Sequence, residues 1–256
     1  MSRRVLAIAA KLALALASLA PPLARAQDSV EERLSDDRLA PIVPGVYVAG
    51  DKIGFSLDTL GGEFLLRMDG TPEVFVLYPN RTSLGGRVLK YDSGETALLV
   101  AGWGGMTLYT DAQPGGLPAV RTGDSVAPSP PSVSLSDMQS AAGDSGQRLA
   151  YVRRLTLNFT ADWNALASDS ALRSFAYDAM ENAARGLDRF AAYPAAHDAL
   201  ARRVNTVSIQ TSSRPLIVLN GKTLVVTFNP GRSFEGRASS RAIAHALSTL
   251  LSVPQK

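Results

Sequence analysis

Residues 41–122 alternate between apolar and polar positions in short runs. Seven runs carry β-branched, aromatic and aliphatic residues, and Gly, Asp, Asn and Pro residues separate them. Short strands joined by tight turns are typical of an antiparallel meander, and closure into a small barrel would hide its edge strands. The runs predict strands over residues 45–49, 53–58, 62–69, 72–78, 86–92, 96–102 and 106–110.

The apolar period lengthens in the second half of the chain. Between residues 171 and 193, apolar residues recur at spacings of three and four, which predicts one amphipathic helix. Pro194 interrupts this pattern, residues 195–203 favour a second helix, and Ser239 or Ser240 can cap a final helix. Strands are predicted over residues 148–159, 204–210, 215–220 and 223–229, the last two joined by an Asn220-Gly221 hairpin turn.

Together these patterns predict the α+β class. Residues 41–122 would form an antiparallel β-meander or small barrel-like module, and residues 148–256 a β-α-(α)-β-β-β-α layer module. Residues 123–147 are rich in Pro, Ser, Ala and Gly, and three prolines between residues 128 and 131 oppose a helix or a central strand. We therefore expect a linker between the two modules.

The N-terminus has the pattern of a signal peptide. Arg3 and Arg4 precede an apolar run of about 16 residues, shorter than the ~20 that a membrane-spanning helix needs. Ala24-Arg25-Ala26 fits a cleavage site, so we expect residues 1–26 to be removed after export by the Sec or the twin-arginine route. Residues 27–40 carry five acidic and two basic residues and predict a solvated acidic leader.

Cleavage would change the charge of the protein. The whole chain has 26 basic and 23 acidic residues, and four of the basic residues lie in residues 1–26, so the net charge would fall from +3 to −1. This balance gives no reason to expect nucleic-acid binding. Residues 27–125 carry 14 acids and 8 bases, whereas residues 126–256 carry 9 acids and 14 bases. The two halves could dock on each other, the basic half could take an anionic partner, or the arginines could simply cover a solvated face.

Several kinds of chemistry are excluded or disfavoured by composition. The chain has no cysteine, which excludes thiol catalysis, iron–sulfur clusters and cysteine-ligated zinc. Gly143-Asp144-Ser145-Gly146 resembles the stretch around the nucleophilic serine of chymotrypsin-like proteases. In that family the catalytic histidine precedes the serine, whereas both histidines here, His197 and His245, follow it, and the motif falls in the expected linker. The histidines have no zinc-protease spacing. We expect no catalytic residue, no metal and no cofactor.

Carboxylates in the second half offer the one enzymatic alternative. Asp178, Glu181 and Asp188 lie near one stripe of the predicted helix, and Asp162 precedes it. Paired carboxylates can act as general acid and base. Because Arg185 follows Glu181 by four residues, a solvated face with a surface ion pair is the simpler interpretation.

Gly102-Trp103-Gly104-Gly105 interrupts the last two predicted strands of the β module. Glycine within a strand pattern usually marks a bulge or a close backbone approach, in which case Trp103 would cover the end of the barrel. Alternatively, Trp103 is a stacking platform in a binding surface with Arg81, Arg87 and Arg121 of the same module. Tryptophan and arginine are frequent interface anchors.

Two resemblances add to this picture. Residues 77–124, with the signal peptide and Gly236-Arg237-Ala238-Ser239-Ser240-Arg241, resemble an exported proteobacterial family classed as domain of unknown function 4908. The resemblance implies location and domain arrangement, and brings no catalytic residue. Residues 83–91 are similar, with a different spacing, to the Ser-Gly-x-x-Tyr loop of periplasmic inhibitors of c-type lysozyme, which are small β-barrels.

We therefore expect a periplasmic or extracellular, non-enzymatic binding or structural protein of the cell envelope, whose partner is an envelope protein or a glycan. Two alternatives stay open: an envelope-polymer hydrolase that uses Asp162 and Asp178, and a lysozyme-inhibitor-like barrel. No membrane span is expected once the signal peptide is removed.

Overall fold

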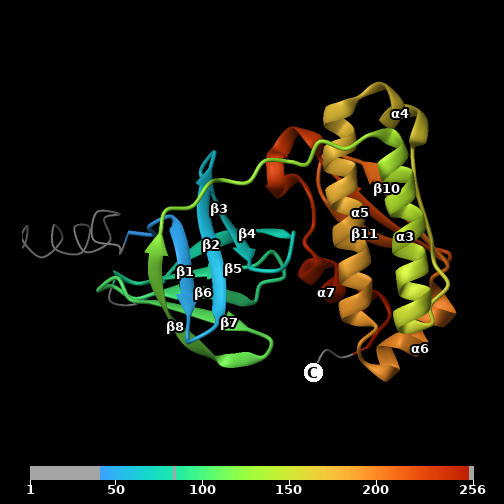
Figure 1. Cartoon of the computed structure of the whole chain (residues 1–256). Helices are drawn as coiled ribbons and strands as arrows, with labels where there is room; N and C mark the ends of the chain where they lie inside the picture. The colour runs from blue at the N-terminus through green and yellow to red at the C-terminus, as the bar shows by residue number, and fades with distance from the viewer. Residues whose placement is uncertain (1–40, 83–84, 254–256) are drawn as a thin grey trace, which may run out of the picture. The chain divides into compact units, whose positions relative to one another are not determined.

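The computed structural model describes residues 41–82 and 85–253 of the chain (Figure 1). The predicted signal peptide and acidic leader therefore lie outside the described residues. The described residues form one compact unit, which contains a closed β-barrel followed by a four-stranded sheet with helices. The α+β class with a barrel-like N-terminal module is thus confirmed.

The barrel is an antiparallel meander of eight strands in sequence order, closed by pairing between the first and the last strand. The strands are β1 (Gly45–Ala49), β2 (Ile53–Leu60), β3 (Glu63–Met68), β4 (Val74–Arg81), β5 (Arg87–Lys90), β6 (Thr96–Val100), β7 (Met106–Thr110) and β8 (Gln113–Gly123). Seven of them correspond to predicted runs. β8 was missed because its glycines and its two prolines, Pro114 and Pro118, read as turn signals rather than as a strand.

Alternate residues of each strand fill the barrel interior, which explains the period of two in the sequence. Leu57 of β2 is opposite Leu66 of β3, and Phe55, Leu89 and Leu98 belong to the same core on β2, β5 and β6. All five side chains are fully buried. The barrel is therefore a packed core, and binding sites belong to its two ends and its outer wall.

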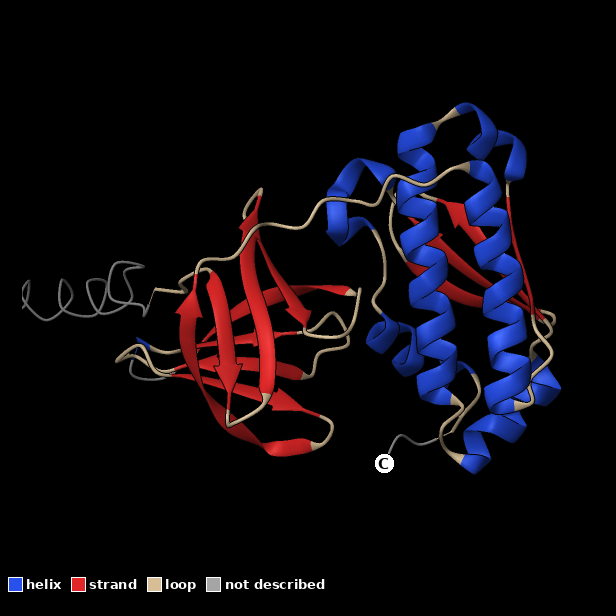
Figure 2. Cartoon of the chain, in the orientation of Figure 1, coloured by secondary structure: helices blue, strands red, loops and turns tan. Residues whose placement is uncertain are grey.

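The second part is a sheet of order β11-β12-β10-β9 with helices on one face (Figure 2). Helix α5 lies between α3, which contacts β9, and α7, which contacts β11. Parallel pairing joins β9, β10 and β12, and β11 runs antiparallel to β12 through the predicted turn at Gly221. The elements are α3 (Leu135–Arg153), β9 (Asn158–Ala161), α4 (Trp163–Ser168), α5 (Ser170–Phe190), α6 (Pro194–Arg203), β10 (Thr206–Thr211), β11 (Leu216–Asn220), β12 (Thr223–Phe228), the 3-10 segment η3 (Pro230–Gly236) and α7 (Ser240–Leu250).

Helix α3 corrects the sequence analysis. It occupies much of the predicted linker, residues 123–147, and the first part of the strand predicted over residues 148–159. The prolines end before Ser134, which caps the helix by accepting a hydrogen bond from Asp137 N. The buried residues of α3 are Met138, Ala142, Ser145 and Leu149, a helical stripe whose two small members do not stand out as apolar in the sequence.

None of the helices within the described residues is long and apolar enough to cross a membrane.

Candidate functional site

One end of the barrel carries the hairpin loops that follow β2, β4 and β6. The loop after β6 presents Trp103, which is 86 % exposed, and Gly104 makes its turn at a φ of 90°. A Cβ on Gly86, in the loop after β4, would lie 3.0 Å from the carbonyl oxygen of Val100 and 3.7 Å from the nitrogen of Gly102, so these two loops touch. Trp103 does not cover the barrel core, which corrects that alternative. We call this part of the barrel the Trp103 end.

Strand register brings the predicted arginines to the same end. Arg87 pairs with Arg81 and with Val100, and Arg121 pairs with Tyr47. Val100 and Tyr47 belong to the barrel core, and residues directly opposite each other in antiparallel strands point to the same face. All three arginines therefore occupy inward-facing positions of their strands at the Trp103 end.

Arg121 and Arg87 differ in their hydrogen bonding. Arg121 Nε donates to the carbonyl oxygen of Pro44 at 3.0 Å, its guanidinium pairs with Asp124, and its side chain crosses Gly45 where a Cβ would clash with it. Arg87 Nε is buried and has no hydrogen-bond partner among the described residues. Because buried N–H groups normally have a partner, the Trp103 end carries hydrogen-bonding capacity that the described residues leave unused.

The stretch similar to lysozyme inhibitors belongs to the barrel wall in its described part. Ser83 and Leu84 lie outside the described residues. Arg87–Lys90 forms β5, and Tyr91 is buried with its ring edge-to-face against Phe75, the centroids 5.2 Å apart. Tyr91 is therefore a core residue and is not available to insert into the cleft of another protein.

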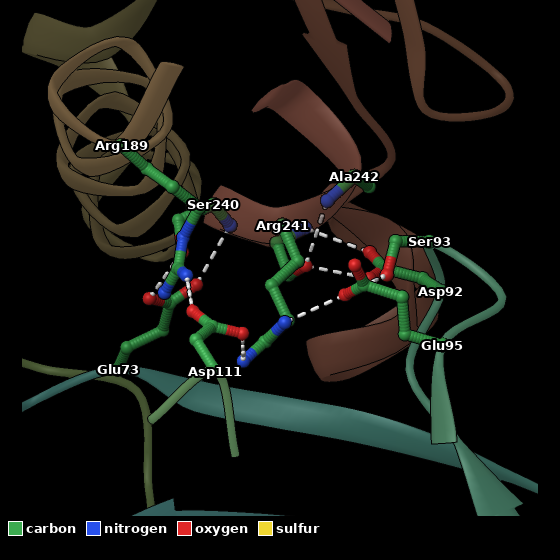
Figure 3. Close-up of polar contacts among 10 residues, drawn as sticks. Glu73, Asp92, Ser93, Glu95, Asp111, Arg189, Ser240, Arg241 and Ala242 are labelled. Atoms are coloured by element: carbon green, nitrogen blue, oxygen red, sulfur yellow. Dashed lines mark hydrogen bonds and ion pairs between the residues drawn. The ribbon is translucent and has the colours of Figure 1, made fainter. Parts of the chain in front are cut away.

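A second cluster of polar residues joins the barrel to α7 (Figure 3). The segment Arg237-Ala238-Ser239-Ser240-Arg241, which we call the docking segment, leads into this helix. Ser239 donates to Asp92 from its backbone nitrogen at 2.8 Å and from Oγ at 2.5 Å, and Ser240 donates to Glu73 from the same two atoms at 2.7 Å each. A helix N-terminus has unsatisfied N–H groups and favours negative charge. Two carboxylates of the barrel thus occupy the N-terminus of α7.

Glu73 is deeply buried in this arrangement, at 3 % exposure. Burial raises the pKa of its carboxyl above the usual value, although the hydrogen bonds from Ser240 and the charges of Arg185 and Arg237 work in the opposite direction. Both carboxylate oxygens accept hydrogen bonds from Ser240. Glu73 is therefore a structural acceptor for α7 rather than a group poised to move a proton.

The arginines of the docking segment also reach the barrel. Arg237 donates to the carbonyl oxygen of Val74 at 3.0 Å and pairs with Asp178 of α5. Arg241 pairs with Glu95 at 2.6 Å and with Asp111 at 2.7 Å, and its guanidinium lies 4.4 Å from the ring centroid of Tyr91. The docking segment therefore contacts both the barrel and α5, at residues that are distant from it in the sequence.

Asp111 receives a second arginine from the helical layer. Arg189 of α5 pairs with the carboxylate oxygen that Arg241 leaves free (Figure 3). Burial acts to raise the pKa of Asp111, but the charges and hydrogen bonds of Arg241 and Arg189 outweigh it and lower the pKa. The opposite charges of the two halves thus meet here, which supports the docking interpretation of the charge pattern.

A cleft of about 900 Å³ lies beside these contacts. The barrel contributes Glu73, Tyr91 and Asp111 to its lining, and the helical layer contributes Arg148 and Tyr193 together with residues of α7.

The residues of the expected alternative chemistries lie apart. Ser145 is on the buried face of α3. Nε2 of His197 is 2.8 Å from the carbonyl oxygen of Arg153, and His245 is exposed on α7. Among the described residues, no group of three or more histidine, aspartate or glutamate side chains could hold a metal ion.

The carboxylates of the hydrolase alternative have structural partners. Asp162 caps α4 by accepting a hydrogen bond from Ala165 N at 3.1 Å, and Asp178 pairs with Arg237. Glu181 pairs with Arg185 at 3.1 Å, as its spacing predicts. Asp188 pairs with Arg153 at 2.7 Å. The structure therefore gives each of these four carboxylates a cap or an ion pair.

Comparison with known proteins then decides the family. Residues 25–247 match the model of the family described as Domain of unknown function (DUF4908). The chain belongs to the DUF4908 family. Neither a curated protein nor a solved structure gives a significant match to this DUF4908 chain.

The sequence analysis of this DUF4908 protein did not predict that the docking segment contacts the barrel. Two signals pointed toward this contact: the opposite charge of the two halves, and the hexapeptide of residues 236–241, which was a minor part of the family resemblance. Neither signal names the barrel partners, because Glu73 and Ser240 are 167 positions apart in the sequence.

Proposed function

We propose that this chain is an exported protein that binds an anionic glycan of the cell envelope, without catalysis, at the Trp103 end of its barrel. The signal-peptide pattern of residues 1–26 supports export. The observation that carries the binding proposal is the register of Arg81, Arg87 and Arg121, which sets three guanidinium groups on inward-facing positions around one end of a filled barrel, beside an exposed tryptophan.

The chemistry of these side chains fits an acidic sugar polymer. An exposed indole offers a flat apolar face for a sugar ring, and guanidinium groups bind carboxylates or phosphates through charge-assisted hydrogen bonds. Trp103 stands on a short turn between paired strands, with the hydrogen bonds Ala101 N to Gly105 O and Gly104 N to Ala101 O at 2.8 Å each. A platform held in this way loses little freedom on binding.

The proposal of binding without catalysis is supported by the hydrogen bonds and ion pairs that the carboxylates of the cleft make. Glu73 and Asp111 line one cleft with unlike pKa shifts, as a general acid and base would. However, Ser240 occupies both oxygens of Glu73, and two arginines occupy those of Asp111. Proton transfer to a substrate would first require these contacts to break.

The binding proposal can be tested on the mature chain, residues 27–256, by tryptophan fluorescence. The chain has two tryptophans, so Trp163→Phe leaves Trp103 as the only reporter. We expect polygalacturonate to change the Trp103 emission, with an affinity that falls as salt is added, and neutral dextran to have no effect.

Variants then assign the binding to the proposed residues. Arg87→Gln and Arg121→Gln should each weaken binding about tenfold, because a hydrogen bond to a charged group contributes ~1.5–3 kcal/mol. Arg202→Gln, at an exposed position of α6, is the matched control and should bind as the parent does. The proposal is contradicted if Arg87→Gln and Arg121→Gln bind as tightly as Arg202→Gln, or if the parent protein does not bind polygalacturonate.

Export is tested separately by cell fractionation. The mature protein should be found outside the cytoplasm, with Gln27 as its first residue. An intact N-terminus in the cytoplasm contradicts this part of the proposal and leaves the binding test unaffected.

A further inference from the structure

The cleft beside the docking segment has the size of a small-molecule site. Its volume of about 900 Å³ lies within the ~300–1,000 Å³ that such sites usually enclose. Its walls come from the barrel end opposite to the Trp103 end and from α3, α5 and α7. The contacts of Glu73 and Asp111 with the helical layer hold these walls in place.

Part of the lining is apolar and open to solvent. Val152 of α3 is 55 % exposed, and Tyr193, at the start of α6, is 50 % exposed. Phe75, Tyr91 and Phe190 contribute buried aromatic surface to the same cleft. Large apolar side chains that line a cleft and stay exposed offer contact area to the body of a ligand.

The charged lining is paired, with one exception. Arg185, Arg189 and Arg241 are engaged with Glu181, Asp111 and Glu95, and Asp188 is engaged with Arg153. Arg148 of α3 also lines the cleft, is exposed, and makes no hydrogen bond or ion pair with any described residue. Arg148 and Val152 are four positions apart, so they share one face of α3.

We propose that this cleft binds a small organic anion, whose apolar body contacts Val152 and Tyr193 and whose carboxylate or sulfonate group pairs with Arg148. Cation and apolar surface are adjacent on one helix face, which suits a ligand with its charge at one end. The proposal concerns a different region from the glycan surface and does not depend on it.

The dye 1-anilinonaphthalene-8-sulfonate is a suitable probe, because it is an aromatic anion whose fluorescence rises in apolar surroundings. We expect saturable binding of one dye per chain to the folded protein. Octanoate and 2-naphthoate should displace the dye, whereas the uncharged alcohols octanol and 2-naphthol should displace it at least tenfold less well. Displacement by both acids and alcohols alike contradicts the role of the charge.

Matched variants locate the dye. Arg148→Gln and Val152→Asp should each weaken dye binding about tenfold, whereas Arg202→Gln and Tyr151→Ala should not change it. Tyr151 is the matched control, because it is on the same helix and 90 % exposed but does not line the cleft. Binding that does not saturate, or that is unchanged in Arg148→Gln and Val152→Asp, overturns the proposal.

The outcome is independent of the proposed function. Trp103→Ala and Arg87→Gln should bind the dye as the parent protein does, and polygalacturonate should not displace it. Loss of glycan binding with intact dye binding, or the reverse, shows which of the two proposals fails.

Discussion

Glu73 links the two parts of the molecule at the level of a single side chain. Its two oxygens accept the backbone N–H and the hydroxyl of Ser240, and both residues are almost fully buried. A donor that is buried without an acceptor costs ~1–3 kcal/mol. The contribution of Glu73 to stability therefore depends mainly on the two donors of Ser240, which would lose their acceptor if Glu73 were removed.

The first prediction follows from this burial. Glu73→Ala should lower the free energy of unfolding by about 1–3 kcal/mol, because Ser240 N and Oγ would be left without an acceptor. Glu95→Ala is the control: Glu95 is half exposed and its ion pair with Arg241 should contribute about 1 kcal/mol or less. Urea unfolding measures both, and equal effects would contradict the role given to Glu73.

At the residue scale, the sequence predicts local partners better than distant ones. Ser239 caps α7 by accepting a hydrogen bond from Ala242 N, and the pair Glu181–Arg185 forms at its helical spacing. Both depend on residues within four positions of each other. Ser239 also donates to Asp92, which is 147 positions away, and no local pattern encodes that contact.

Among the helices, α5 and α7 approach each other closely because Gly186 faces α7. A Cβ at Gly186 would lie 2.7 Å from Cβ of Ile243 and 2.9 Å from the carbonyl oxygen of Ser240. The backbone of α7 cannot move away without disturbing Ser240, which is fixed on Glu73. The close crossing thus couples helix packing to the docking segment.

The second prediction compares two helical glycines. Gly186→Ala should lower the free energy of unfolding, because overpacking costs ~1–3 kcal/mol and outweighs the better helix propensity of alanine. Gly143→Ala in α3 has open space at its Cβ and should raise the free energy by about 0.5–1 kcal/mol. Thermal unfolding of both variants checks this, and stabilisation by Gly186→Ala would contradict the close crossing.

At the element scale, the quality of the prediction follows the strength of the apolar pattern. Helix α5 was predicted within three residues at its C-terminal end, because its stripe of large apolar side chains recurs over many turns. Helix α3 was missed because alanine and serine occupy half of its buried stripe. Strand β8 was missed because its position is set by pairing with β1 and β7 and not by its own composition.

At the Trp103 end, composition predicted the candidate residues, but not the strand register that brings them together. Residue types alone indicated Trp103, Arg81, Arg87 and Arg121 as candidates. Their common inward-facing position depends on pairs such as Tyr47 with Arg121, which join the first strand to the last. That register could not be predicted from the alternation of residues within each strand.

For the whole molecule, the described residues belong to a single compact unit, and polar contacts join the barrel to the helical layer. Trp163 begins α4 of the second part and is partly buried, so its emission can report on the helical layer. Trp103 is 86 % exposed and would change little on unfolding, so amide hydrogen exchange of β2 and β6 is the reporter of the barrel. If the contacts couple the two parts, both reporters should detect the same transition.

The third prediction uses this pair of reporters. In Trp103→Phe, the urea midpoint from Trp163 emission, which reports on the helical layer, and the midpoint from amide protection of β2 and β6, which reports on the barrel, should be the same. Adding Arg241→Glu to this variant places like charges against Glu95 and Asp111 and should separate the two midpoints. Two separate midpoints without Arg241→Glu would contradict the coupling.

Closure of the barrel also has a consequence for how fast the protein folds. The ladder that completes the barrel joins Val46 to Gly123, so its first strand has only one of its two neighbours until the eighth strand arrives. Contacts between residues so far apart in sequence slow folding, because a long loop must close before they form. Closure of the barrel should therefore be a slow step of folding, whereas β9, β10 and β12 pair with strands that are nearer in the sequence.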